Sequence, residues 1–122
     1  MTDISSPFDP AALDRLVRFG GEKLLASMID VFRSNGRERL DAARAALDAG
    51  DAAAAALAVH SLKSSAAQLG AMKLSGLCAD AEVAARAERL EPLAGSLPEL
   101  VAAYDDAVRW MSGRVARQGS EG

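Results

Sequence analysis

The sequence contains one histidine, His60, which is the first candidate for chemistry. An exposed imidazole is partly neutral at pH 7 and then keeps a nucleophilic ring nitrogen. With 100° per residue on a helix, the core face of this segment is formed by Ala58, Leu62, Ser65 and Leu69. His60 then points nearly opposite, toward solvent. The pattern therefore predicts a histidine that an external reactant can reach.

Small side chains and one cation surround His60 on the predicted helix: Ala53, Ala56, Lys63, Ser64 and Ala67. Small neighbours leave room for a bulky electrophile or for another protein. Lys63 follows His60 by three residues and lies on the same side of the helix. Its ammonium favours an anion, such as a phosphoryl group, beside the ring. A surface histidine without a function fits the same spacing, so the pattern alone leaves both interpretations open.

Other chemistries of histidine have less support. One His and one Cys cannot form a structural zinc site, and we expect neither a metal site nor a cofactor in this chain. A Ser–His–Asp triad is imaginable, but nothing in the sequence marks a strained nucleophile turn or an oxyanion hole.

The helix that carries His60 follows two others that capping residues and glycines delimit. Asp9 and Pro10 open a short first helix, which ends at Gly20-Gly21. A second helix is expected over Glu22–Ala49, because apolar residues recur there at helical spacing. Asn35-Gly36 is expected to be a weak point or kink in this helix.

Three more helices complete the predicted chain. The helix with His60 covers Asp51–Leu69, with the aspartate as its N-cap, and the next covers roughly Ala71–Leu90. A loop is expected around Pro92. Ser96 and Glu99 have the spacing of a capping box, which predicts that the last helix begins there.

Length and composition define the fold class. Alanine accounts for 27 of the 122 residues and aromatic residues for 4%, which favours helices over strands. The length predicts one domain. Four substantial helices with short connections imply an all-α, antiparallel four-helix bundle with a short additional N-terminal helix. The bundle is expected over residues 9–117, between a flexible N-terminus (1–8) and a flexible C-terminal tail (118–122).

Charge and hydropathy exclude several classes of partner. The net charge of −3 argues against a nucleic-acid protein, which needs a basic face. The longest apolar run, Ala52–Val59, is far shorter than the roughly 20 residues of a membrane span, and the N-terminus does not resemble a signal peptide. A reducing, cytoplasmic setting is the simplest expectation, with Cys78 as a small buried residue.

The stretch around His60 resembles the histidine phosphotransfer (HPt) domain family of two-component phosphorelays. The family pattern is roughly His-x-Leu-Lys-Gly-Ser/Ala, with a glycine soon after. The positions that match here are His60, Leu62, Lys63, Ser65 and Gly70. The likeness of the helix layout extends over about residues 9–115, which is nearly the whole chain.

The resemblance implies a role for three side chains. His60 would be phosphorylated on Nε2, and Lys63 would help to hold the phosphoryl oxygens. Glu82 matches a position on the next helix from which the family often bonds Nδ1 of the imidazole. Such an acceptor fixes the tautomer and leaves Nε2 free to attack. The alternative for Glu82 is a solvated charge on a helix surface, like Glu88 or Glu91. Arg86 and Arg89 are likewise expected on a solvated face.

Ser64 departs from the family pattern, which usually has glycine four residues after the histidine. Serine adds bulk close to the ring, and it also adds a hydroxyl that could bond a phosphoryl oxygen. Its neighbour Ser65 is expected on the core side, with its hydroxyl bonded to a carbonyl one turn earlier.

The resemblance also implies the partners and the reaction. A bacterial phosphorelay is expected, in which His60 accepts a phosphoryl group from a response-regulator receiver domain and passes it to another. A hybrid histidine kinase is expected upstream, Mg²⁺ is expected in the receiver, and this chain is expected to be a monomer. Because the chain has no ATP-binding motif, no ATP-dependent kinase activity is expected. Two alternatives stay open: an HPt-like docking module that carries no phosphate, and an unrelated helical interaction protein.

Overall fold

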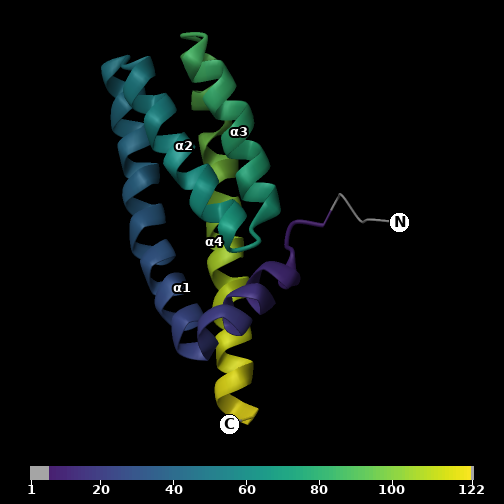
Figure 1. Cartoon of the computed structure of the whole chain (residues 1–122). Coiled ribbons are helices and arrows are strands. Elements are labelled where there is room, and N and C mark those ends of the chain that lie inside the picture. The colour runs from purple at the N-terminus through teal and green to yellow at the C-terminus, as the bar shows by residue number, and fades with distance from the viewer. Residues whose placement is uncertain (1–5, 122) are drawn as a thin grey trace.

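The computed structural model describes the backbone of residues 6–121 and the side chains of residues 6–116. It contains four helices: α1 (Pro10–Ala49), α2 (Ala52–Gln68), α3 (Met72–Arg86) and α4 (Leu90–Glu121). Each helix packs against the next one in the chain, and α4 also packs against α1 (Figure 1). The predicted all-α antiparallel four-helix bundle is therefore confirmed.

Gly21 bends α1 close to its N-terminal end. Its backbone, with φ 82° and ψ 179°, is not helical and is one that L side chains rarely adopt. Figure 1 shows the segment before this glycine, in purple, crossing the bundle at a steep angle to the rest of α1. The predicted short first helix is confirmed as this segment, with Asp9 as its N-cap and Pro10 in its first turn.

Ion pairs attach both sides of this bend to α4. Arg114 Nη1 lies 3.1 Å from Asp14 Oδ1, before the bend, and its Nη2 lies 3.9 Å from Glu22 Oε2, after it. The N-terminal segment also reaches α4 through Phe8, whose ring stacks on Trp110 at a centroid distance of 4.5 Å. These contacts fix the crossing angle of the first segment.

Asn35-Gly36 does not interrupt α1, contrary to the expected weak point. Gly36 is buried, and a Cβ atom at this position would collide with the ring of Tyr104 on α4. The Tyr104 hydroxyl in turn donates to the carbonyl oxygen of Arg33. Glycine stands here because two helices approach closely, and a sequence pattern does not distinguish this role from a helix break.

The helix that carries His60 begins after a capping aspartate and ends before a glycine. Asp51 caps α2 by accepting a hydrogen bond from the backbone N–H of Ala54 at 3.0 Å. Gly70, with φ 79°, turns the chain from α2 toward α3, and its carbonyl accepts from the Asp9 N–H at 2.8 Å. The predicted bounds of this helix are confirmed to within one residue at each end.

The last two helices have boundaries that differ from the prediction. Helix α3 ends at Arg86 rather than near Leu90, because Glu88 adopts a left-handed backbone with φ 60°. Helix α4 begins at Leu90, so no loop precedes Ser96 and no capping box forms. The Ser96 hydroxyl instead donates to the Leu93 carbonyl at 3.1 Å.

Proline tolerance and burial explain the early start of α4. Pro92 lies in the first helical turn, where its missing N–H needs no partner. An apolar stripe on one side of the first turns is buried and consists of Leu93, Leu97 and Leu100. Burial of this stripe stabilises the helix, which continues past Pro98.

The expected flexible ends lie partly outside the described residues. Residues 1–5 and 122 are not described, and the side chains of residues 117–121 are not described either. Of the expected flexible N-terminus, the described part contacts the bundle, because the Pro7 carbonyl accepts from the Lys73 N–H at 3.1 Å. Within residues 6–121, none of the helices combines the length and the apolar character that crossing a membrane requires.

Candidate functional site

His60 lies on the exposed side of α2, where it borders α3. Its side chain is 48% exposed, and Nδ1 lies 2.9 Å from Oε2 of Glu82 on α3. Of the four expected core-face residues, Ala58, Leu62 and Leu69 are buried, whereas Ser65 is half-buried. The predicted solvent-facing histidine is thus half exposed, because α3 covers one edge of the ring.

Glu82 is the one charged residue that is buried among residues 6–116, and three cationic or polar donors surround its carboxylate. Lys63 Nζ donates to Oε1 at 2.6 Å. Arg86 donates to Oε2 through Nε at 2.8 Å and through Nη2 at 2.6 Å. The interpretation of Glu82 as a solvated surface charge is therefore wrong.

The charges around Glu82 keep it ionised. Hydrogen bonds from Lys63 and then from Arg86 lower the pKa of the Glu82 carboxyl from 4.5 to about 2, against the opposing effect of burial. The contact with His60 lowers this pKa further. Because charge-assisted bonds to a carboxylate are strong, the cluster fixes an anion at the edge of the imidazole.

An ionised carboxylate determines which ring nitrogen carries the proton. A carboxylate only accepts hydrogen bonds, so the Nδ1 atom that faces Glu82 Oε2 must carry a hydrogen and donate. In the neutral imidazole, Nε2 then holds the free lone pair. This arrangement prepares His60 to attack an electrophile through Nε2.

The expected small neighbours of His60 are exposed at three positions: Ala53, Ser64 and Ala67. The fourth, Ala56, was expected beside the ring but is only 4% exposed, because α3 packs against this side of α2. Leu57 is exposed instead, to 70%. The accessible face around His60 is therefore more apolar than expected.

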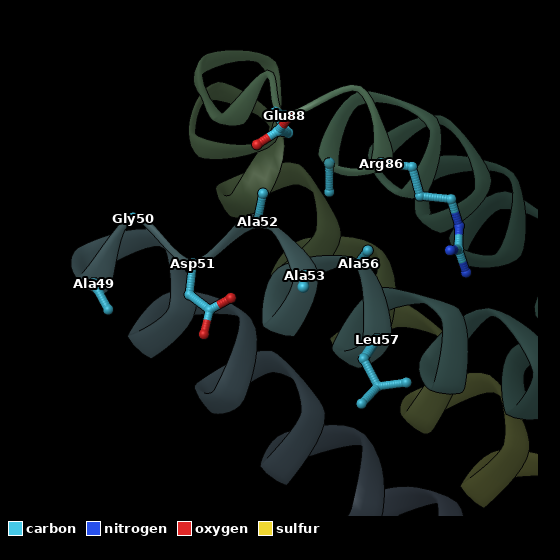
Figure 2. Close-up of a pocket in the computed structure, with 10 residues that line it drawn as sticks. Ala49, Gly50, Asp51, Ala52, Ala53, Ala56, Leu57, Arg86 and Glu88 are labelled. Carbon is cyan, nitrogen blue, oxygen red and sulfur yellow. The ribbon is translucent and has the colours of Figure 1, made fainter.

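An open groove of about 790 Å³ continues this small-residue face toward the start of α2. Ala52, Ala53 and Ala56 line it from α2, and Ala85 lines it from α3. Figure 2 shows Arg86 at the edge of this groove, with its guanidinium extending away from the Gly50 end.

The remaining motif residues have structural contacts. The Ser65 hydroxyl donates to the Ser61 carbonyl at 3.3 Å, one turn earlier, as expected. The Ser61 hydroxyl accepts from Arg39 Nε at 3.0 Å, which ties α2 to α1. Gly70 contacts the Asp9 carbonyl so closely that a Cβ atom would collide with it. These residues build the helix and its end.

Cys78 lies buried on α3, as expected for a small apolar residue. Burial raises the pKa of its thiol from 9.0 to about 12, although the nearby Lys63 charge opposes the change. Because the thiolate is the reactive form, this burial disfavours reaction of the thiol at neutral pH.

Arg86 is the residue that sequence reasoning placed outside the site. Its expected role was a solvated surface charge, yet it bonds the carboxylate that faces His60. The four-residue spacing of Glu82 and Arg86 on one helix was a signal for this contact. Arg89, read in the same way, has an exposed side chain.

The comparisons with known proteins concern the sequence and the fold of this chain. The sequence model of the Hpt domain matches residues 27–110, which is more than half of the chain and includes α2 and α3. The chain belongs to the Hpt domain family. As a member, it is a histidine phosphotransfer module of phosphorelay signalling, and the family implies interaction with response-regulator receiver domains.

A solved Hpt structure has the same fold over almost its whole length. The crystal structure of histidine-containing phosphotransfer protein B (HptB) from Pseudomonas aeruginosa PAO1 matches with a TM-score of 0.86 and 26% sequence identity. The match covers 93% of this chain and 97% of that one. Among curated proteins, no sequence matches this chain.

Proposed function

We propose that this Hpt domain is a phosphorelay intermediate that carries the phosphoryl group on Nε2 of His60. It accepts this group from the aspartyl phosphate of one receiver domain and passes it to an aspartate of another. The observation that carries the proposal is the 2.9 Å contact between Nδ1 and Glu82 Oε2, since it leaves Nε2 as the nucleophile.

In the forward step, the Nε2 lone pair forms a bond to phosphorus. The bond between phosphorus and the aspartyl oxygen breaks, and the receiver aspartate leaves as a carboxylate with the electron pair. The Nδ1 proton stays on the ring, which becomes positive when Nε2 is phosphorylated. Glu82 stabilises this positive charge, because its ionised Oε2 accepts from Nδ1. Return transfer to a second aspartate reverses these changes.

Lys63 is proposed to hold the phosphoryl oxygens. Its ammonium is bonded to Glu82 at 2.6 Å, and its side chain is 31% exposed. A phosphoryl group on the adjacent histidine carries more negative charge than one carboxylate, so it competes for this ammonium. The receiver is proposed to supply Mg²⁺, which offsets phosphoryl charge during transfer.

The receiver is proposed to dock over His60. Leu57, one turn before His60, is 70% exposed, and Val83, next to Glu82, is 66% exposed. Exposed apolar side chains beside polar groups are typical of a transient interface, and the alanine groove that Leu57 helps to line leaves space for partner side chains. A hybrid histidine kinase upstream and a monomeric state of this chain belong to the same proposal.

The proposal is tested with a phosphorylated receiver domain and Mg²⁺. Label that is acid-labile and base-stable should move to this chain, and the variant His60→Gln should take up none. Lys63→Gln should slow the transfer, while the matched control Lys73→Gln, an exposed lysine at the start of α3, should transfer at the wild-type rate.

The docking module is the competing outcome, and exposed Ser64 in place of the usual glycine is the feature that favours it. In that case several competent receivers would bind the chain without labelling it. That result would refute the relay, because a receiver that binds but does not transfer phosphate shows that His60 does not accept it.

A further inference from the structure

Arg86 bonds the same carboxylate oxygen that faces the His60 ring. Its Nε and Nη2 donate to Glu82 Oε2 at 2.8 and 2.6 Å, and Nδ1 of His60 lies 2.9 Å from that oxygen. Lys63 takes the other oxygen, Oε1, at 2.6 Å. Both oxygens of Glu82 are therefore held, and Oε2 is shared between the imidazole and Arg86.

Arg86 contacts Glu82 from the same helix, unlike His60 and Lys63. His60 and Lys63 both reach Glu82 from α2, whereas Arg86 lies one turn after Glu82 on α3. A glutamate has three rotatable bonds, and only some of its rotamers place a carboxylate oxygen against Nδ1. Two donors from one rigid guanidinium select such a rotamer from the same helix.

Stability alone does not account for this pair. The side chain of Arg86 is 61% exposed, while that of Glu82 is 9% exposed. The exposed guanidinium is screened by solvent, so Arg86 supplies only part of the stabilisation that keeps the buried Glu82 carboxylate ionised. An effect on the orientation of Glu82, and through it on His60, is the consequence that this geometry does support.

We propose that Arg86 is a positioning residue of the phosphotransfer site, which holds Glu82 Oε2 against Nδ1 of His60 and thereby directs Nε2 toward the phosphoryl donor. This inference rests on the proposed function of His60. It assigns to Arg86 a role through Glu82 and no contact with the phosphoryl group.

The tautomer of the ring provides a test that needs no phosphate. Because the chain has one histidine, ¹⁵N-histidine labelling yields signals from His60 alone. In the neutral form, the wild-type chain should carry its proton on Nδ1. Arg86→Ala should shift the ring to a mixture with a substantial Nε2–H fraction, while the control Arg89→Ala, which removes another exposed arginine nearby, should match the wild type.

Transfer kinetics test the functional half of the inference. Arg86→Ala should accept phosphate roughly 10-fold more slowly than the wild type. Arg86→Lys keeps the charge but lacks the two-donor fork, so it should restore only part of the rate. Arg89→Ala should leave the rate unchanged.

The possible outcomes separate this inference from the proposed function. If Arg86→Ala keeps the wild-type tautomer and transfer rate, Arg86 does not position Glu82, although the relay through His60 stands. If the wild-type chain takes up no phosphate, the proposed function fails, and with it the inference that rests on it. Circular dichroism melts of all variants check that each one folds.

Discussion

Glu82 connects the electrostatics of the site to its chemistry at the scale of single residues. A buried carboxylate without partners would be protonated or costly to bury. Here Lys63 and Arg86 hold it ionised, and their bonds lower its pKa to about 2. The anion that results is able to fix one imidazole tautomer and to stabilise a positive ring, which a neutral carboxyl would not do.

The low pKa of Glu82 predicts how acid affects stability. A carboxyl with a folded-state pKa of about 2, below its unfolded value near 4.5, stabilises the fold fully above pH 4.5. This contribution is lost as the pH falls from about 4.5 toward 2. We expect Glu82→Gln to be less stable than the wild type at pH 7, and the difference to shrink over that range.

Urea unfolding of both proteins between pH 7 and pH 2.5 measures this difference. The comparison cancels the effect of the other carboxylates, which are present in both chains. A gap between the two proteins that stays constant over the whole pH range would show that the charge of Glu82 does not stabilise the fold.

Ser64 places a hydroxymethyl group near the imidazole ring of His60, at the position where the family usually has glycine. It is exposed, and it follows His60 by one helical turn. We expect Ser64→Gly to accept phosphate faster, because a receiver can approach the ring more closely, although glycine costs about 0.5–1 kcal/mol of helix stability. Initial rates of transfer from one receiver check this, and an unchanged or slower rate would count against crowding by the serine.

The site residues differ in how far sequence could identify them. His60, Lys63 and Glu82 are found because they match positions of a known motif, and the structure brings all three together. Arg86 has no place in that motif. Its role depends on the packing of α3 against α2, which decides which face of α3 meets the imidazole, and helical spacing alone leaves that undecided.

At the scale of elements, helix boundaries are predicted well where a capping residue or a left-handed glycine marks them. They are predicted poorly where a residue serves the packing of helices instead. Caps and left-handed glycines at Asp51, Gly50 and Gly70 mark helix ends in both sequence and structure. After the end of α3 at Arg86, the left-handed residue is Glu88 rather than a glycine, so the sequence carries no signal for this boundary. Gly36 carries the signal of a break but serves a close contact with Tyr104.

Substitution by alanine should have opposite effects on stability at two glycines inside helices, Gly36 and Gly95. Gly36→Ala places a methyl group against the Tyr104 ring, and overpacking of this kind costs about 1–3 kcal/mol. Gly95→Ala lies in α4, where a Cβ atom meets nothing within 4 Å, so it should stabilise the fold by about 0.5–1 kcal/mol.

Thermal and urea unfolding of the two variants beside the wild type test this assignment. If Gly36→Ala proves as stable as Gly95→Ala, then α1 and α4 do not approach each other at Gly36 as closely as described.

For the whole molecule, composition and periodicity are sufficient to predict the bundle. Each of the four helices buries one apolar face, and this burial produces the periodic pattern in the sequence. The alanine content favours helices and permits α2 and α3 to pack closely. What composition does not report is the N-terminal crossing, which Arg114 and the stacking of Phe8 on Trp110 hold in place. Those contacts join residues that are about a hundred positions apart.

The central claim is that a receiver transfers its phosphoryl group to Nε2 of His60. The most direct measurement is ¹⁵N and ³¹P NMR of the histidine-labelled chain after it has been phosphorylated by a receiver. We predict a phosphorus–nitrogen bond at Nε2, with the proton kept on Nδ1. A phosphoryl group on Nδ1, or on any side chain other than His60, would contradict the account.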